Sequence, residues 1–163
     1  MAITNHERVG KALDLLREGL GPFVEREFRG VHGDAAGRAV AERLREDRLN
    51  AGKPLSELDA AALLKLMWDA WNEVFRQTLG FAERSLVSEL RETRNRWAHQ
   101  EAFSGDDAYR ALDSVERMLA AVSAPQSDDA ARMKMELLRL RFDEQVRSEK
   151  RRSAGSAVES AAA

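Results

Sequence analysis

An arginine and a histidine lie five positions apart in the stretch RNRWAH, residues 94–99. A guanidinium group binds the oxygens of a phosphate and stabilises the negative charge that develops on it. An imidazole takes up or releases a proton near neutral pH. Attack of a ribose 2′-hydroxyl on its neighbouring phosphate benefits from an acid and a base and needs no metal ion. The residue types of Arg94, Asn95 and His99 therefore suit RNA cleavage.

The same stretch also has a purely structural interpretation. Arg94 would pair with a neighbouring glutamate, Trp97 would lie in the core, and His99 would cap the C-terminal end of a helix, where positive charge is favoured. On a straight helix Arg94 and His99 lie about 140° apart, whereas Asn95 and His99 share one face. If the helix loosens near its end, Arg94, Asn95 and His99 converge on one phosphate.

Composition is typical of a soluble globular protein. The 163 residues, 44% hydrophobic and 33% charged, are enough for one domain with a single core. The absence of cysteine excludes disulfides, thiolate catalysis and cysteine-based zinc sites. No apolar run approaches the ~18 residues that span a bilayer, and the start MAITNHERVG lacks a signal-peptide segment. We therefore expect a cytoplasmic protein without a membrane partner.

The charge balance limits the kinds of partner. A formal net charge of −2 argues against nucleic acid bound over the whole surface, although a local basic patch on a neutral protein still binds RNA. The basic residues comprise 21 Arg and five Lys. We give more weight to GC-rich coding as the cause of this bias than to a specific role of arginine in binding.

Helical spacing of apolar residues extends over nearly the whole chain, so we expect an all-α protein. The first helix is expected near residues 9–28, with a kink or break near residue 21, where two glycines and Pro22 stand close together. Further helices are expected around residues 34–48, 63–78, 86–97 and 108–122. Short connections favour antiparallel neighbours, hence a bundle of four to five helices.

The sequence changes character after Ala124-Pro125. Residues 126–152 are expected to form a charged connecting helix with a thin apolar stripe of Leu138, Phe142 and Val146, which either docks on the bundle or pairs with another chain. Because the stripe is thin, we expect this helix to add little stability to a domain formed by residues 1–125. The last segment, 153–163, is predicted to be disordered.

Several separate stretches together resemble one protein family. They are NHERVGKALDLLREGLGPFVEREF (5–28), MWDAWNEVF (67–75) and AERSLVSELRETRNRWAHQEAFSGDDAYRALDSVERML (82–119). They resemble the HEPN superfamily, the higher eukaryotes and prokaryotes nucleotide-binding domains. Within it they are most similar to the subfamily named after the yeast transcript-quality-control endonuclease. The resemblance covers roughly residues 5–123.

The resemblance implies an antiparallel helix bundle whose R-x-x-x-x-H motif is the ribonuclease site in active members. The arginine position of that motif falls on Arg94, the polar position after it on Asn95 and the histidine on His99. Members are typically homodimers with two motifs facing across a cleft, act without metal, and serve in toxin–antitoxin and anti-phage systems. Similar bacterial domains are often fused to a large ATPase, so an ATPase domain in the same or a partner chain is an expected partner.

Residues near the motif have two interpretations each. Arg91 and Arg96 either form a local phosphate track for RNA or are solvated helix residues. Trp71 and Phe75 fall on a core stripe, whereas Trp68 lies off it and is the one aromatic residue we consider for an interface.

The remaining polar residues favour structural roles. His6 and His32 belong to no pattern of partners, and HERVG near the N-terminus is most simply the start of a helix. Asp106 and Asp107 stand where a helix N-terminus favours negative charge. We interpret them as caps, and we expect neither a metal site nor a cofactor.

These lines of argument predict an all-α HEPN-like domain that acts on RNA. It would be either a metal-independent endoribonuclease or an RNA-binding module, in a defence or toxin-type system. In the first case Arg94 holds the scissile phosphate, Asn95 orients the phosphate or the histidine, and His99 is the acid/base. Two other classes stay open: a non-catalytic dimerisation or assembly module for an attached ATPase, and a nucleotide-binding sensor.

Overall fold

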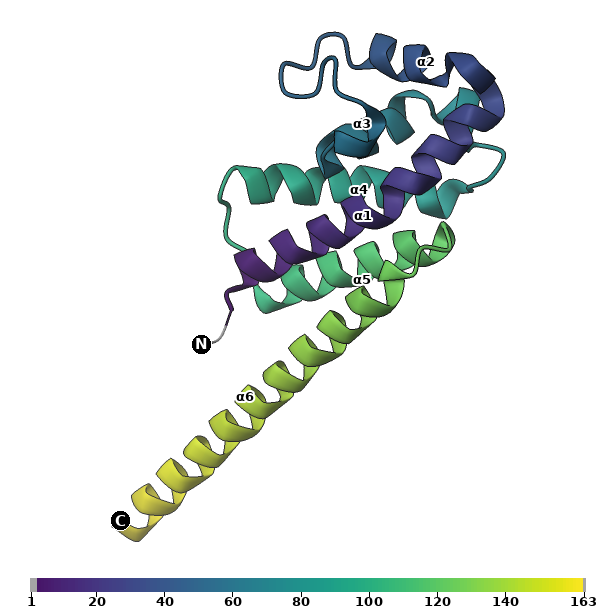
Figure 1. Cartoon of the computed structure of the whole chain (residues 1–163). Coiled ribbons are helices and arrows are strands. Elements are labelled where there is room, and N and C mark those ends of the chain that lie inside the picture. Colours follow the sequence, from purple (N-terminus) through teal and green to yellow (C-terminus); the bar gives the residue numbers. More distant parts are fainter. Residues whose placement is uncertain (1–2, 163) are drawn as a thin grey trace.

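The structure, a computed structural model, describes residues 3–162 of the chain, and the side chains of residues 3–156. Its six α-helices (Figure 1) are α1 Asn5–His32, α2 Ala36–Arg43, α3 Ala60–Asp69, α4 Phe81–Ala98, α5 Gly105–Ala121 and α6 Gln126–Ala162. Residues 3–162 contain no strand, so the predicted all-α class is confirmed. None of the described helices is both long and apolar enough to cross a membrane.

Helix α1 is continuous through the glycine and proline positions near residue 21. The Thr4 hydroxyl oxygen caps it by accepting a hydrogen bond from the Glu7 amide at 3.1 Å, and Gly33 ends it. Gly19 is explained by packing, because a Cβ added there would lie 2.3 Å from Leu119 Cδ2 of α5. Pro22 lies exposed inside the helix. Of the kink or break expected near residue 21, the break does not occur, since the contacts of α1 with its neighbours compensate for one missing amide hydrogen bond.

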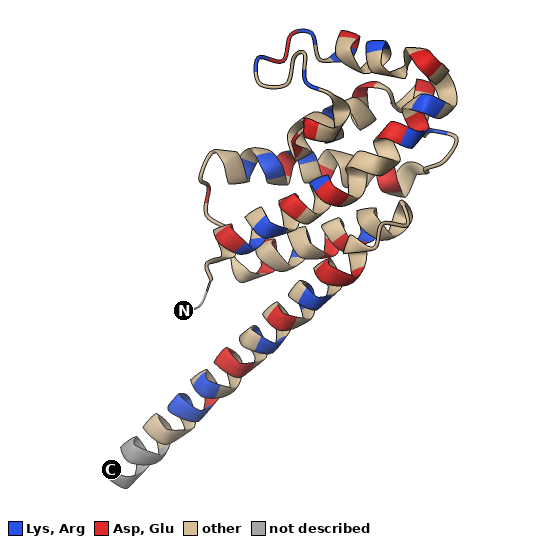
Figure 2. Cartoon of the chain, in the orientation of Figure 1, with Lys and Arg blue, Asp and Glu red and all other residues tan. Residues whose placement is uncertain are grey.

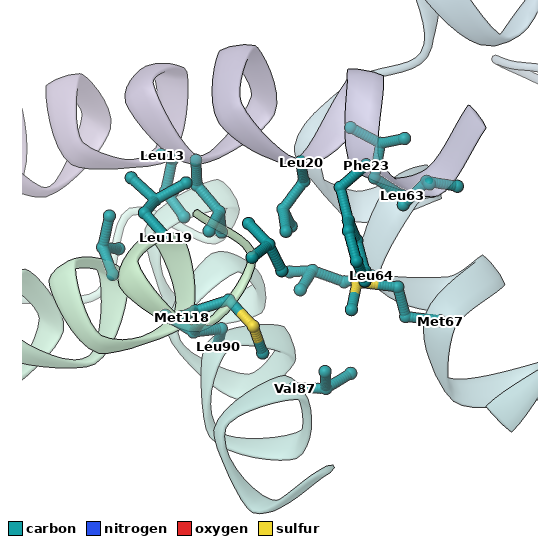
Figure 3. Close-up of a cluster of buried hydrophobic side chains, with 14 of the residues drawn as sticks. Leu13, Leu20, Phe23, Leu63, Leu64, Met67, Val87, Leu90, Met118 and Leu119 are labelled. Carbon is teal, nitrogen blue, oxygen red and sulfur yellow. The ribbon is translucent and has the colours of Figure 1, made fainter. Parts of the chain in front are cut away.

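Helices α1, α3, α4 and α5 enclose one hydrophobic core. α1 and α4 each pack against both α3 and α5, and the short loop 99–104 makes α4 and α5 antiparallel neighbours (Figure 1). Figure 3 shows apolar side chains from all four helices meeting in the interior, among them Leu20, Leu64, Leu90 and Leu119. The inward face predicted for the helix at 108–122 is buried: Ala108, Leu112, Val115, Leu119 and Val122. The predicted antiparallel bundle is thus confirmed.

The helix predicted around residues 63–78 changes its winding after Asp69. Residues Trp71–Phe75 form a π-helix, in which the Arg76 amide donates to the Trp71 carbonyl oxygen at 2.8 Å. This wider turn changes the register by about one residue. Trp71 is 4% exposed and Phe75 is fully buried, which confirms their predicted place in the core.

Helix α6 contacts the bundle through a different stripe from the one that the sequence indicates. Leu138 and Phe142 are 37% and 65% exposed, whereas Ala130 and Leu137 are buried against the bundle. The Lys134 ammonium group adds ion pairs to Asp113 and Glu116 of α5, at 3.1 and 2.6 Å. The sequence pattern did not indicate these contacts, because they are made by isolated residues of different types, Ala130, Lys134 and Leu137, and not by a continuous apolar stripe. The packed unit therefore continues past residue 125 to Leu137.

The second half of α6 projects away from the bundle (Figure 1). It continues as helix through Ala162 and so includes most of the segment 153–163 for which the sequence predicts disorder. Alanine has the highest intrinsic helix propensity, and the alanines of this segment favour continuation of the helix. Ala163 lies outside the described residues.

Candidate functional site

The RNRWAH stretch occupies the last turn of α4 and its C-cap. Arg94 and Asn95 lie within the helix, and His99 is the C-cap residue, with its amide donating to the Asn95 carbonyl oxygen at 3.0 Å. Gln100 takes the left-handed conformation at φ 60°, and the Gln100 and Glu101 amides donate to the carbonyl oxygens of Trp97 and Arg96. This is the Schellman arrangement, in which a helix ends sharply without losing its last hydrogen bonds.

Helix α4 keeps its regular winding through Ala98, so the loosening that would bring Arg94 and His99 together does not occur. Within one chain the two residues stay on different sides of the helix, about 140° apart. Asn95 and His99 share a face, and both side chains are exposed. The structure therefore brings Asn95 next to His99 and leaves Arg94 to one side.

Arg94 is half-buried, and it lines a small hollow between α3 and α4 with Asn95, Arg91 and Lys65. Among the described residues no carboxylate oxygen lies within 4.0 Å of its guanidinium nitrogens. The structural alternative in which Arg94 pairs with a neighbouring glutamate is therefore not observed. Its guanidinium group has the capacity to bind an anion.

Arg96 connects the end of α4 to the start of α5. Its guanidinium group donates to Glu101 and to Asp107, each at 3.2 Å, and to the Ala102 carbonyl oxygen at 3.0 Å. It also lies over the Phe103 ring, 4.7 Å from the centroid. Because two carboxylates already balance its charge, Arg96 is a weaker candidate for binding phosphate than Arg94.

The caps expected at the start of α5 are confirmed in Asp107. The Ser104 hydroxyl accepts from the Asp107 amide at 3.0 Å, and the Ser104 amide donates to the Asp107 carboxylate at 3.2 Å. This backbone hydrogen bond, together with those from Arg96 and the Ser104 side chain, lowers the pKa of Asp107 below its usual value of 3.8. The described residues contain no group of three or more His, Cys, Asp or Glu side chains arranged to hold a metal ion.

The first turn of α1 closes over the end of α4, a relationship that no sequence pattern indicates. The side chains of His6 and Trp97 are each hydrogen-bonded to the backbone carbonyl oxygen of the other residue. Asn5 Nδ2 donates to the Phe103 carbonyl oxygen at 3.1 Å. The buried Arg8 donates to Asn5 Oδ1 at 2.9 Å. HERVG is thus a helix start, as expected, but it also holds the turn that carries His99.

Comparison with known proteins identifies one family. A family model described as Swt1-like HEPN matches residues 11–123, from the first turns of α1 to just past the end of α5. The matched range includes all of α4 and therefore Arg94, Asn95 and His99. No curated protein and no solved structure matches the chain.

Proposed function

Because the chain belongs to the Swt1-like HEPN family, we propose that it binds RNA and cleaves it without a metal ion, using Arg94, Asn95 and His99. The observation that supports this most strongly is the state of Arg94. It is a half-buried guanidinium group without a carboxylate partner among the described residues, on the same helix end as the exposed His99. A group in that state favours an anion, and a phosphodiester is the anion that a histidine at the same helix end would act on.

The chemistry assigns a separate task to each residue. The ribose 2′-oxygen attacks its own phosphorus, the bond from phosphorus to the 5′-oxygen breaks, and a cyclic phosphate and a 5′-hydroxyl result. The His99 imidazole removes the proton from the 2′-hydroxyl or delivers one to the leaving oxygen. Arg94 binds the equatorial oxygens as their charge grows. Asn95, on the face of His99, orients the phosphate.

The geometry of α4 supports a site that is completed by a second copy of the chain. The reaction uses both a base and an acid, whereas one chain supplies one histidine at this helix end, about 140° from Arg94. A symmetric homodimer with the two helix ends facing each other supplies two histidines and two arginines. Light scattering at roughly tens of micromolar should give the mass of a dimer, and a monomer there would contradict this arrangement.

Cleavage of an RNA panel in the presence of EDTA tests the proposal. Wild type should cut at least one RNA, and Arg94→Ala and His99→Ala should each reduce the rate by about 10²–10⁴ because a positioned acid/base or phosphate clamp contributes that much. His32→Ala is the matched control, because His32 lies at the C-terminal end of α1 and outside the motif. This variant should cut RNA like wild type. Circular dichroism melting should show all four proteins folded.

One result would overturn the enzyme assignment. If wild type and His99→Ala bind RNA equally and neither cuts it, the chain is a non-catalytic module, either for assembly with an ATPase or for sensing nucleotides. The toxin-type or anti-phage setting that we propose rests on the family pattern. Induced expression in growing bacteria should arrest growth for wild type and not for His99→Ala, and equal growth would count against that setting.

A further inference from the structure

Half-buried arginines fall into two groups in this protein. Three of them bind carboxylates: Arg43, Arg96 and Arg141. The other three have no carboxylate oxygen within 4.0 Å in the described part of the chain: Arg84, Arg91 and Arg94. All three of the second group lie on α4. The buried Arg8 of α1 also lacks a carboxylate at that distance among the described residues, but its guanidinium group donates to Asn5 Oδ1. Because a partly desolvated guanidinium group is unfavourable without a counter-charge, the three arginines of α4 favour the binding of an anion.

The unpaired arginines share the face of α4 that ends in the motif. Counting from Arg94 on an ideal helix, Arg91, Arg84, Asn95 and His99 lie at about 60°, 80°, 100° and 140°. No glutamate or aspartate of α4 falls inside that sector. Lysine and arginine colouring gathers on the half of α4 that leads into loop 99–104 (Figure 2). The arginines therefore form a row about 15 Å long from Arg84 to Arg94, along the helix axis.

Helix α3 adds an aromatic ring and a further cation to this row. The guanidinium carbons of Arg84 and Arg91 lie over the Trp68 ring, 4.9 and 5.9 Å from its centroid. Lys65, one turn before Trp68, lines the hollow with Arg91 and Arg94. We call Lys65, Trp68, Arg84, Arg91 and Arg94 the α3–α4 strip.

Two carboxylates lie near the strip, and neither is paired with an arginine of α4. Asp69 is bound to Lys65 at 2.6 Å. Asp47 also lines the hollow, and it accepts hydrogen bonds from the Leu49 and Asn50 amides and from the Asn50 side chain, at 3.0–3.2 Å. Neither neutralises the three arginines of α4.

We propose that the α3–α4 strip binds a single strand of RNA and leads it along α4 to the motif. Phosphates would bind the guanidinium groups, while a base stacks against the aromatic and guanidinium groups of Trp68, Arg84 and Arg91. Single-stranded nucleic acid is bound by this combination, a cationic track with aromatic or guanidinium planes for the bases. A duplex keeps its bases stacked inside and offers the strip only phosphates. The ligand class is therefore unpaired RNA.

The inference rests on the proposed function, because the strip ends at the motif whose chemistry requires RNA. It adds the substrate class and the direction of approach. A protein partner with an acidic surface would use the same cations, but it would leave the stacking surface without a role. It is therefore kept as an outcome of the test.

The test measures binding separately from cleavage. A fluorescein-labelled single-stranded oligouridylate is titrated with His99→Ala protein, so that the probe stays intact, and anisotropy is read at several salt concentrations. Introducing Arg84→Gln and Arg91→Gln into the His99→Ala protein should weaken RNA binding about tenfold at about 0.1 M salt. The slope of the logarithm of the binding constant against the logarithm of the salt concentration should fall by about 1.4, which corresponds to two lost phosphate contacts. The same protein should bind the matched RNA duplex more weakly than the single strand.

Two further variants control for charge and for stacking. Arg26→Gln with Arg38→Gln removes the same charge from exposed residues of α1 and α2 and should leave the affinity within about twofold, since it removes no contact of the strip. Trp68→Phe should lose most of the quenching of tryptophan emission that RNA causes, since Trp71 is buried and Trp97 is covered on one face by the stacked His6 ring. Thermal melting identifies any variant that is unfolded.

The outcomes separate this inference from the proposed function. If the strip variant binds RNA like the charge control while wild type still cuts RNA, the strip is wrong and the ribonuclease stands. If the strip variant loses binding and wild type does not cut, the strip stands as a binding site without catalysis. If no RNA binds and the strip variant instead disrupts the dimer in light scattering, the strip is a protein interface and the inference is overturned.

Discussion

His6 and Trp97 are joined by two reciprocal hydrogen bonds. Trp97 Nε1 donates to the His6 carbonyl oxygen at 3.1 Å, and His6 Nε2 lies 3.0 Å from the Trp97 carbonyl oxygen. Because a carbonyl oxygen only accepts, the proton is on Nε2 of His6. The two rings stack, with centroids 5.3 Å apart and planes 11° from parallel. The pair joins the first turn of α1 to the last turn of α4, two residues before His99.

Substituting both His6 and Trp97 should destabilise the domain by less than the sum of the two single substitutions. We expect Trp97→Ala to lower the free energy of unfolding by about 3 kcal/mol, since it deletes a large packed ring. His6→Ala should cost about 1 kcal/mol for its hydrogen bond. In urea unfolding the double variant should cost about 0.5 kcal/mol less than the sum, because each single variant already removes the same ring stacking. Strictly additive losses would show that the stacking of the two rings contributes nothing, and exposed His99→Ala is the control.

Two glycines of α1 should respond in opposite directions to alanine. At Gly19 a Cβ would meet Leu119 Cδ2 at 2.3 Å, so Gly19→Ala should lower the free energy of unfolding by about 1–3 kcal/mol through overpacking. At Gly30 nothing lies within 4 Å of an added Cβ. Gly30→Ala should therefore raise the free energy of unfolding by about 0.5–1 kcal/mol, the gain in helix propensity. Equal responses in denaturant unfolding would refute the close approach of α1 and α5.

Shortening α6 should distinguish its packed half from its projecting half. A chain that ends after Glu144 keeps Ala130, Leu137 and the Arg141–Asp106 ion pair. Its free energy of unfolding should lie within about 0.5 kcal/mol of that of the full chain. A chain that ends after Pro125 uncovers α5 and should lose about 3 kcal/mol or more. Calorimetry or circular dichroism measures both. Unchanged melting of the shorter chain would restore the view of residues 126–152 as a mere connector.

Acid should weaken the junction between α4 and α5. The pKa of Asp107 is lowered in the folded chain, chiefly by the Ser104 amide and then by Arg96, so its carboxylate stabilises the fold above the usual value of 3.8. That contribution is lost as the pH falls through the folded pKa. Asp107→Asn should therefore melt below wild type at pH 7, and the difference should narrow as the pH falls below 3.8. A constant difference would contradict this, and Asp14→Asn, at an exposed position, is the control.

The candidate site was partly predictable from sequence. The spacing in RNRWAH places Asn95 and His99 on one face of a helix, because helical periodicity is local and α4 stays regular to Ala98. That Arg94 lacks a carboxylate partner, whereas Arg96 has two, depends on which residues of α3, α5 and loop 99–104 lie nearby. Both are arginines two positions apart, and no pattern within α4 distinguishes them.

The sequence by itself determined the all-α class, the capping role of Asp107 and the buried face of α5, because these depend on local hydrogen bonding and on apolar spacing. Only the tertiary structure decided how the elements meet. It showed Gly19 as a close approach of α1 to α5, Leu137 in place of Leu138 as a core residue of α6, and His6 as the partner of Trp97. Contacts between residues 91 positions apart depend on the packing of whole helices, and a short window of sequence carries no signal for them.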